Sequence, residues 1–166
     1  MEKLISVIIV SFNSKDFLDK CLKSLLNTSL EKRQLEIIVI DNASTDRTFE
    51  FFRKKYPSII IYRNKQNLGF AKANNLGIKK AQGKYILLLN PDTVVPINCL
   101  PQMVDFMEKN TRAAIATCRV ELEEGTLDDA CHRGFPSPWN AFCYFLCSSC
   151  AWDCSGYYNC SGSGGG

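Results

Sequence analysis

Short runs of apolar, β-branched residues alternate along residues 1 to about 120 with segments whose apolar residues recur at helical spacing. Ile5 to Val10 is a nearly continuous apolar run, and Leu35 to Ile40 is a second one. Such runs suit strands that are buried on both faces of a parallel sheet. The residues with helical spacing between them are Phe17, Leu18, Cys21, Leu22, Leu25 and Leu26. This order predicts a parallel α/β sheet with right-handed crossovers.

The same alternation continues along the chain. Asn13 or Ser14 is expected to cap the first helix, and Ser44 is expected to cap the second, which ends before Pro57. Gly83 is expected to stop the third helix. The further strands are expected at 58–62, 85–89 and about 113–119, and the later helices at 70–81 and 100–109.

Length and charge limit the kinds of function that need to be considered. The chain has 166 residues and a net charge of +3, which is too weak to indicate a nucleic-acid partner. No apolar run approaches the roughly 18 residues that indicate a membrane span. Composition changes near residue 134, because the only charged residue from Gly134 to Gly166 is Asp153. We therefore predict one folded domain over 1–133 and an atypical tail, rich in Cys, Gly and Ser, over 134–166.

Polar segments follow four of the expected strands. They are Ser11-Phe12-Asn13, Asp41-Asn42-Ala43-Ser44, Asn64 with Asn67-Leu68-Gly69-Phe70, and Asn90-Pro91-Asp92-Thr93. In an open parallel sheet, ligands bind beyond the carboxyl ends of the strands. Turns alone also favour these residue types, so each segment by itself is weak evidence. The glycine signatures of dinucleotide-binding and P-loop proteins are missing, and an Asn-Pro-Asp turn does not suit a phospho-acceptor domain of the receiver type.

Four motifs carry a resemblance to a known family. They are Ser-Val-Ile-Ile-Val-Ser-Phe-Asn (6–13), Val-Ile-Asp-Asn-Ala-Ser-Thr-Asp (39–46), Asn-Leu-Gly-Phe-Ala-Lys-Ala-Asn-Asn (67–75) and Leu-Leu-Leu-Asn-Pro-Asp-Thr (87–93). In this order they resemble the family 2 glycosyltransferases, most closely the rhamnosyltransferase-like branch. The resemblance implies a Rossmann-like GT-A sandwich, with a mostly parallel sheet flanked by helices, of which this chain is the donor-binding part.

The resemblance also implies roles for individual residues. Asp41 would accept a hydrogen bond from the ring N–H of a pyrimidine. The alternative is a purely structural role in a helix-capping turn. Asp92 resembles the last residue of the Asp-x-Asp metal site of the family, and it would bind Mg²⁺ or Mn²⁺ together with the donor diphosphate. Its bland alternative is a Pro-Asp turn. The remaining donor-binding candidates are Ser11, Asn13, Asn67, Gly69, Asn74 and Asn90.

The reaction implied by the resemblance is an inverting sugar transfer from a pyrimidine-diphosphate sugar. The donor would carry UDP or dTDP, with rhamnose as the choice weighted by the family, and the acceptor would be a glycan or a lipid-linked glycan. Cell-surface polysaccharide synthesis is the matching context. We expect a cytoplasmic location. One form of it is peripheral association with the inner face of the plasma membrane.

The general base of such a reaction is not found in the sequence. An inverting transfer needs a carboxylate that takes the proton of the acceptor hydroxyl. After residue 130 the only acidic residue is Asp153, and the carboxylates from Glu121 to Asp129 lie in a hairpin-like stretch. The alternative to an enzyme is therefore a catalytically incomplete module that binds a nucleotide sugar. A third interpretation is a purely structural α/β domain with a zinc-binding tail.

The cysteines of the tail leave several alternatives open. The chain has nine cysteines, and five of them are Cys143, Cys147, Cys150, Cys154 and Cys160. Their spacing suits a zinc site or one face of a helix. Disulfides would need an oxidising compartment, and palmitoylation is a further possibility. The remaining alternative is a tail whose cysteines have no chemical function.

Overall fold

Four parallel strands form the central sheet. They are β1 (Ile5–Ser11), β2 (Leu35–Asp41), β3 (Ile60–Arg63) and β4 (Tyr85–Leu89), in the order β3-β2-β1-β4. β1 and β2 pair along their whole length, from Ile5 beside Leu35 to Ser11 beside Asp41. Both strands are buried at every position, as their apolar sequences predict. The computed structural model describes residues 3–122 and 124–126.

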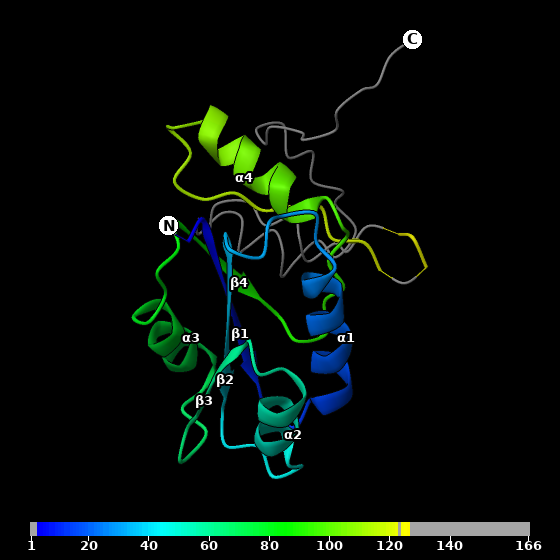
Figure 1. Cartoon of the computed structure of the whole chain (residues 1–166), viewed down its shortest axis with the longest axis vertical. Coiled ribbons are helices and arrows are strands. Elements are labelled where there is room, and N and C mark those ends of the chain that lie inside the picture. Colours follow the sequence, from blue (N-terminus) through cyan, green and yellow to red (C-terminus); the bar gives the residue numbers. More distant parts are fainter. Residues whose placement is uncertain (1–2, 123, 127–166) are drawn as a thin grey trace, which may run out of the picture. The chain divides into compact units, whose positions relative to one another are not determined.

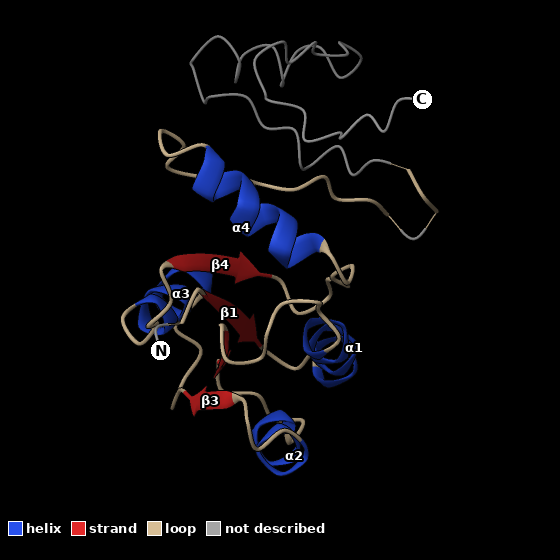
Figure 2. Cartoon of the chain, turned by 45° about the horizontal axis from the view of Figure 1, so that its top comes forward, coloured by secondary structure: helices blue, strands red, loops and turns tan. Residues whose placement is uncertain are grey.

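Helices cover both faces of this sheet. They are α1 (Lys15–Leu26), α2 (Thr48–Lys55), α3 (Phe70–Ile78) and α4 (Cys99–Lys109). Figures 1 and 2 show α3 on one side of the strands and α1 and α2 on the other. The α/β class and the parallel sheet predicted from the sequence are thus confirmed.

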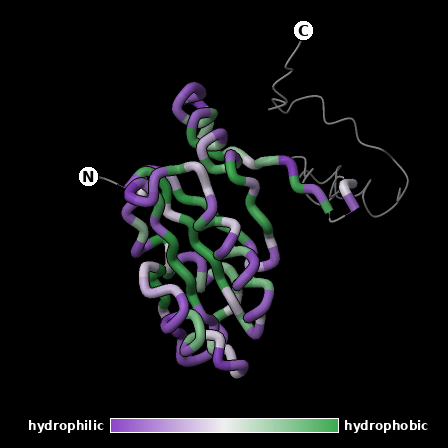
Figure 3. The backbone as a smooth tube through the Cα atoms, turned by 45° about the vertical axis from the view of Figure 1, so that its right-hand side comes forward, coloured by the Kyte–Doolittle hydropathy of each residue, from purple (hydrophilic) through white to green (hydrophobic). Residues whose placement is uncertain are grey.

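The core follows the two-residue period of the strands. Ile5, Val7 and Ile9 of β1 face one cluster, which also holds buried side chains of α1, α2 and α4. Val10, on the opposite face, packs in a second cluster with Ala73 of α3. Figure 3 shows the same arrangement as hydrophobic strands at the centre and hydrophilic segments around them. Apolar residues of β1 therefore contribute to one of two apolar layers on opposite faces of the sheet.

Several expected helix boundaries differ from the structure. Ser44 does not cap α2, because its hydroxyl accepts the backbone N–H of Asn13 instead. The N-cap position of α2 is Arg47, which makes no capping hydrogen bond with its side chain. Asp46, one residue earlier, accepts the backbone N–H and the hydroxyl of Thr48 with its Oδ1. Ser14 holds the cap position of α1 but makes no capping hydrogen bond with its side chain.

The third helix is shorter than expected, and Gly83 has another role. The helix ends at Ile78 rather than at residue 81. Gly83 lies against β1, where an added Cβ would approach the backbone nitrogen of Ser6 to 2.5 Å. Its own N–H donates to the hydroxyl of Ser6, which in turn donates to the buried carboxylate of Glu36. Gly83 is therefore required for the close approach of the chain to the sheet.

The strand expected at about 113–119 is absent from the structure. These residues have no regular secondary structure, and Ile115 is 89% exposed. Apolar residues alone do not make a strand unless a neighbour supplies the hydrogen bonds of a ladder. The chain divides into two units, 1–114 and 115–166, and all helices and strands named above lie in the first. The predicted boundary at 133–134 lies outside the described residues.

The length and polarity of the helices bear on membrane insertion. In the part of the chain that the structure describes, none of the helices has both the length and the apolar character needed to cross a bilayer.

A charged cluster ties α1 to α2. Asp19 of α1 accepts hydrogen bonds from Lys55 (2.7 Å) and from the hydroxyl of Tyr56 (2.8 Å), and it pairs with Lys23 at 2.8 Å. Burial by itself raises the pKa of Asp19, but these three partners outweigh burial and lower the pKa to about 2. The ionised carboxylate is therefore favoured in the folded state.

The cluster predicts how stability changes in acid. Because the pKa of Asp19 is lower in the folded chain than its ordinary 3.8, its contribution is complete above about pH 4 and is lost as the pH falls toward 2. We expect Asp19→Asn to lower the free energy of unfolding by about 1 kcal/mol at pH 7 and to flatten its pH dependence between 2 and 4. Urea titrations across this pH range measure both. Asp16→Asn, at an exposed position of the same helix, is the control, and equal behaviour of the two variants would contradict the assignment.

Candidate functional site

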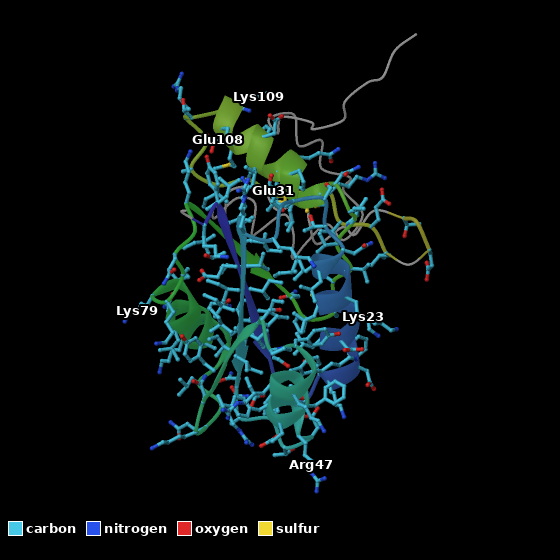
Figure 4. All side chains as sticks on the ribbon, in the orientation of Figure 1. Lys23, Glu31, Arg47, Lys79, Glu108 and Lys109 are labelled. Atoms are coloured by element: carbon cyan, nitrogen blue, oxygen red, sulfur yellow. The ribbon has the colours of Figure 1, made fainter. Side chains whose placement is uncertain are left out.

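The carboxyl ends of β1 and β2 bring the predicted site residues together. Ser11 and Asp41 are paired neighbours at the ends of these strands, and both are fully buried. The loop that follows Asp41 leads to α2, and Arg47 on this loop is labelled in Figure 4 at that end of the molecule. The sheet register thus aligns two sequence motifs that lie thirty residues apart.

The carboxylate of Asp41 is the central polar group of this site. It is 0% exposed, and its Oδ1 accepts the backbone N–H of Ser44 at 3.3 Å. Its Oδ2 has no hydrogen-bond partner among the described residues. Arg63 lies nearby, with its Nε 3.5 Å from that oxygen. A buried carboxylate oxygen without a hydrogen-bond donor lowers the stability of the fold. It indicates a place where an N–H or O–H group of a ligand can bind.

An amide network joins the loops that follow β2 and β3. The side chain of Asn42, which is 3% exposed, donates to Oδ1 of Asn67 at 2.7 Å. Its own Oδ1 accepts from Asn64 Nδ2 at 2.9 Å and from the backbone of Leu68 at 3.0 Å. Asn67 also accepts the N–H of Gly69, at 2.9 Å. The predicted residues Asn67 and Gly69 are thus positioned by Asn42, which the sequence analysis did not select as a site residue.

Asn13 fastens the loop after β1 to the loop after β2. Its Oδ1 accepts the backbone N–H of Thr45 at 2.8 Å, and its backbone N–H donates to Ser44 at 3.0 Å. The side chain of Asn13 therefore supports the loop on which Asp41 depends. Ser11 does the same on the buried side, where its carbonyl accepts the N–H of Asn42 at 2.8 Å.

Backbone strain is concentrated in the same two loops. Among the described residues other than glycine, positive φ angles occur at Asn13 (49°), Ala43 (68°) and Arg47 (61°). Asparagine tolerates this region, whereas alanine and arginine adopt it at a cost. Such conformations persist where the surroundings hold them, and they cluster at functional sites. Gly69 (φ 78°) begins α3 with open space where a Cβ would lie.

The other predicted residues are placed differently. Asn74 is 4% exposed, and its side chain donates to the carbonyl of Phe70 in its own helix, so the structure does not connect it with the loops. Asn90 and Asp92 follow β4 and are exposed. Burial, and to a lesser extent the charge of Asp92, raises the pKa of the Cys21 thiol in α1 to about 12. This places Asp92 beside α1, on the other side of β1 from Asp41.

A metal ion at the predicted site, Asp92, would need ligands from a bound nucleotide sugar in addition to those of the protein. Among the described residues, no three His, Cys, Asp or Glu side chains converge on one point. Asp92 is exposed, and no described residue holds its carboxylate in a hydrogen bond or ion pair. Mg²⁺ is commonly bound by one or two carboxylates together with substrate phosphates and water. The single carboxylate of Asp92 fits this mode of binding.

Two groups at this end were missed by sequence reasoning. Arg63 closes β3 and lines an open pocket of about 630 Å³, together with Ala43, Ser44, Thr45, Asn64 and Lys65. Phe12 is 48% exposed directly after β1, next to the Ser11–Asp41 pair. The signal for Phe12 that was available in the sequence is an aromatic residue within a polar segment that follows a strand. For Arg63, only the end position on a short strand was available.

Comparison with known proteins identifies the family. The family model of glycosyl transferase family 2 matches residues 6–158. The chain belongs to glycosyl transferase family 2. The match includes the four strand-end segments described above, so the predicted family is confirmed, and the rhamnosyltransferase-like branch stays a prediction.

Individual relatives agree with this family. The chain is 36% identical over 110 residues to an uncharacterized glycosyltransferase of Haemophilus influenzae, covering 64% of this chain and 33% of the relative. It is 34% identical over 110 residues to the poly(ribitol-phosphate) beta-glucosyltransferase of Bacillus spizizenii, covering 64% and 17%. The chain therefore spans a third or less of the length of these two relatives.

A solved structure confirms the GT-A-type fold. The S. aureus TarS 1–349 structure in complex with UDP-GlcNAc matches with a TM-score of 0.61 and 25% identity, covering 65% of this chain and 32% of TarS. The α/β sheet with flanking helices is therefore the arrangement of a glycosyltransferase of known structure.

The amide network predicts the effect of removing Asn42. We expect Asn42→Ala to lower the free energy of unfolding by about 1 kcal/mol, because it leaves partly buried groups of Asn64, Asn67 and Leu68 without this partner. Hydrogen exchange at Leu68 and Gly69 should become faster. Asn75→Ala, at an exposed asparagine of α3, is the matched control for urea denaturation and exchange. Unchanged exchange at Leu68 in Asn42→Ala would show that the network does not hold this loop.

Proposed function

We propose that this chain binds a pyrimidine-diphosphate sugar as the donor part of an inverting glycosyltransferase. The observation that carries the proposal is the buried Oδ2 of Asp41, which has no hydrogen-bond donor among the described residues and lies at the carboxyl end of β2. The ring N–H of uracil or thymine is a donor of the right kind, whereas N3 of cytosine is an acceptor. Phe12 offers an exposed ring on which such a base can stack.

The donor class is supported by the relatives. The names of the TarS complexes specify UDP and UDP-GlcNAc, and a UDP-linked sugar is therefore the donor that we propose first. dTDP-rhamnose, which the sequence resemblance favoured, presents the same ring N–H and is the second donor to test. A glycan acceptor in cell-surface polysaccharide synthesis is proposed because related enzymes include poly(ribitol-phosphate) glycosyltransferases. We propose a cytoplasmic site of action, where nucleotide sugars are available.

A divalent cation completes the proposed donor site. Asp92 would hold Mg²⁺ or Mn²⁺, with Asn90 as a neutral neighbour, and the ion would neutralise charge on the leaving diphosphate. Asn13 and the Asn42–Asn67 network would keep the flanking loops in place, so that the base and the phosphates meet preformed groups.

Donor binding without transfer is the second candidate function. It is favoured by three of the four described carboxylates that follow Asp92 along the chain. Asp105, Glu108 and Glu121 each pair with a neighbouring lysine or arginine at 2.7, 2.6 and 3.1 Å, and these contacts do not suit a free general base. Single-turnover assays with a UDP-sugar and mixed glycan acceptors separate the two functions.

The base-recognition role of Asp41 predicts a change in nucleotide binding. We expect the chain to bind UDP and dTDP in calorimetric titrations, and Asp41→Asn to bind both at least about tenfold more weakly, because the amide can present a donor where the base also presents one. Asp105→Asn, at an exposed ion pair of α4, is the control. Absence of UDP and dTDP binding by the folded wild-type chain would refute the proposal.

The role of Asp92 predicts metal dependence. Adding Mn²⁺ should tighten UDP binding by about tenfold or more in the wild-type chain, and Asp92→Asn should remove this gain while leaving metal-free binding unchanged. The titrations are done with UDP in the presence of Mn²⁺ and then of a chelator. If Asp92→Asn keeps the full effect of Mn²⁺, the ion is bound elsewhere.

A further inference from the structure

We propose that the surface formed by β3 and the C-terminal end of α3 docks on an anionic lipid bilayer. This surface, called the basic patch below, consists of Ile60 and Tyr62 of β3, Lys72 and Ile78 of α3, and Lys79 and Lys80 directly after α3. No residue of the basic patch belongs to the proposed donor site. The inference therefore goes beyond the proposed function and does not rest on it.

Charge is distributed unevenly along the chain. Of its 20 basic side chains, nine lie between Phe51 and Pro91, and this range contains none of the 17 acidic side chains. The range includes all of β3, α3 and β4. The overall charge of +3 is therefore the sum of a strongly basic segment and an acidic remainder. A local cluster of lysines, rather than the net charge, is what attracts a protein to an anionic membrane surface.

The lysines of the basic patch are available to an external anion. Three of the nine basic residues enter ion pairs: Lys55 with Asp19, Arg63 with Glu50 and Asp41, and Lys84 with Glu108. Lys72, Lys79 and Lys80 enter no ion pair with any residue that the structure describes, and all three are exposed. Figure 4 shows Lys79 on the outer side of α3. Contact with lipid phosphates would thus break no ion pair within the described part of the chain.

Exposed apolar side chains lie among these lysines. Ile61 packs against the core cluster that includes α1 and α2, so Ile60 and Tyr62 point to the opposite face of the sheet, which α3 covers. Ile60 is 38% exposed, Tyr62 is 37% exposed, and Ile78 at the end of α3 is 37% exposed. Nζ of Lys80 lies 4.6 Å from the centre of the Tyr62 ring. The strand and the chain after the helix therefore form one continuous surface.

This combination favours a bilayer over a soluble polyanion. A phosphate polymer is attracted by lysines alone, whereas a bilayer also takes up isoleucine side chains and accommodates a tyrosine ring at the level of the headgroups. Glu36 of β2 lies on the same face of the sheet, but it is buried and accepts hydrogen bonds from Ser6 and Gln82. Its carboxylate therefore does not face the headgroups.

Vesicle flotation with the whole chain tests the proposal. We expect binding to phosphatidylcholine vesicles that contain about 30% phosphatidylglycerol, and binding to pure phosphatidylcholine that is weaker by at least about tenfold. Sodium chloride at about 0.5 M should weaken the binding. Lys79→Glu combined with Lys80→Glu should lower the affinity by at least about tenfold. Lys20→Glu combined with Lys32→Glu makes the same charge change at exposed positions outside the basic patch and is the control.

The isoleucines separate a bilayer from a soluble polyanion. Ile60→Thr combined with Ile78→Gln keeps every charge, so it should weaken vesicle binding by at least about threefold and leave binding to heparin unchanged. Wild-type vesicle binding by this variant would overturn the inference, because lysines alone would then explain the attraction.

The remaining outcomes are equally clear. Absence of vesicle binding by the wild type, or equal losses in the two charge-reversed variants, would also overturn the inference. UDP titrations of the same variants should match the wild type, since none of them changes the proposed donor site. Failure of the wild type to bind UDP or dTDP would instead refute the proposed function and would leave the basic patch unaffected.

Discussion

The parallel pairing of β1 with β2 is the interaction on which the rest of this structure depends. The register joins Ile5 with Leu35 at one end and Ser11 with Asp41 at the other. Because both strands are buried on both faces, a slip of one residue would exchange the two apolar layers and is therefore strongly disfavoured. The same register brings a charged side chain to the end of a buried strand, where only the loops can satisfy it.

The loops after β1 and β2 contain strained backbone conformations that are held in place by side-chain hydrogen bonds. Ala43 and Arg47 have left-handed backbones, and side-chain bonds from Asn13 and Asp46 hold the segment around them. The cost of each strained residue is of order 1–3 kcal/mol, and it is offset by hydrogen bonds that exist only when the loops are in place. The loops are thus held in place without a ligand, which would reduce the ordering required by the binding proposed above.

The sequence predicted the sheet and the strand-end segments well, because both follow from local patterns. Buried parallel strands produce continuous apolar runs, and β1 and β2 match theirs closely. The predicted cap of α2 was wrong, because the N-cap position is Arg47 and the hydroxyl of Ser44 is engaged instead in a long-range contact with Asn13. Arg63 and Asn42 could not be selected, because their importance arises from contacts across strands that no local spacing records.

The edge strand β4 shows where composition misleads. Its sequence, Tyr-Ile-Leu-Leu-Leu, has the pattern of a central strand, yet among the described strands it pairs only with β1. Ile86 and Leu88 point to the face that α3 covers elsewhere, and they are 45% and 47% exposed. Apolar side chains at this density on an edge are typical of a surface that another segment or partner covers. Asp41 lies on the far side of β1 from this edge, at the end of β2, so the nucleotide binding proposed there can be tested separately from any contact made by β4.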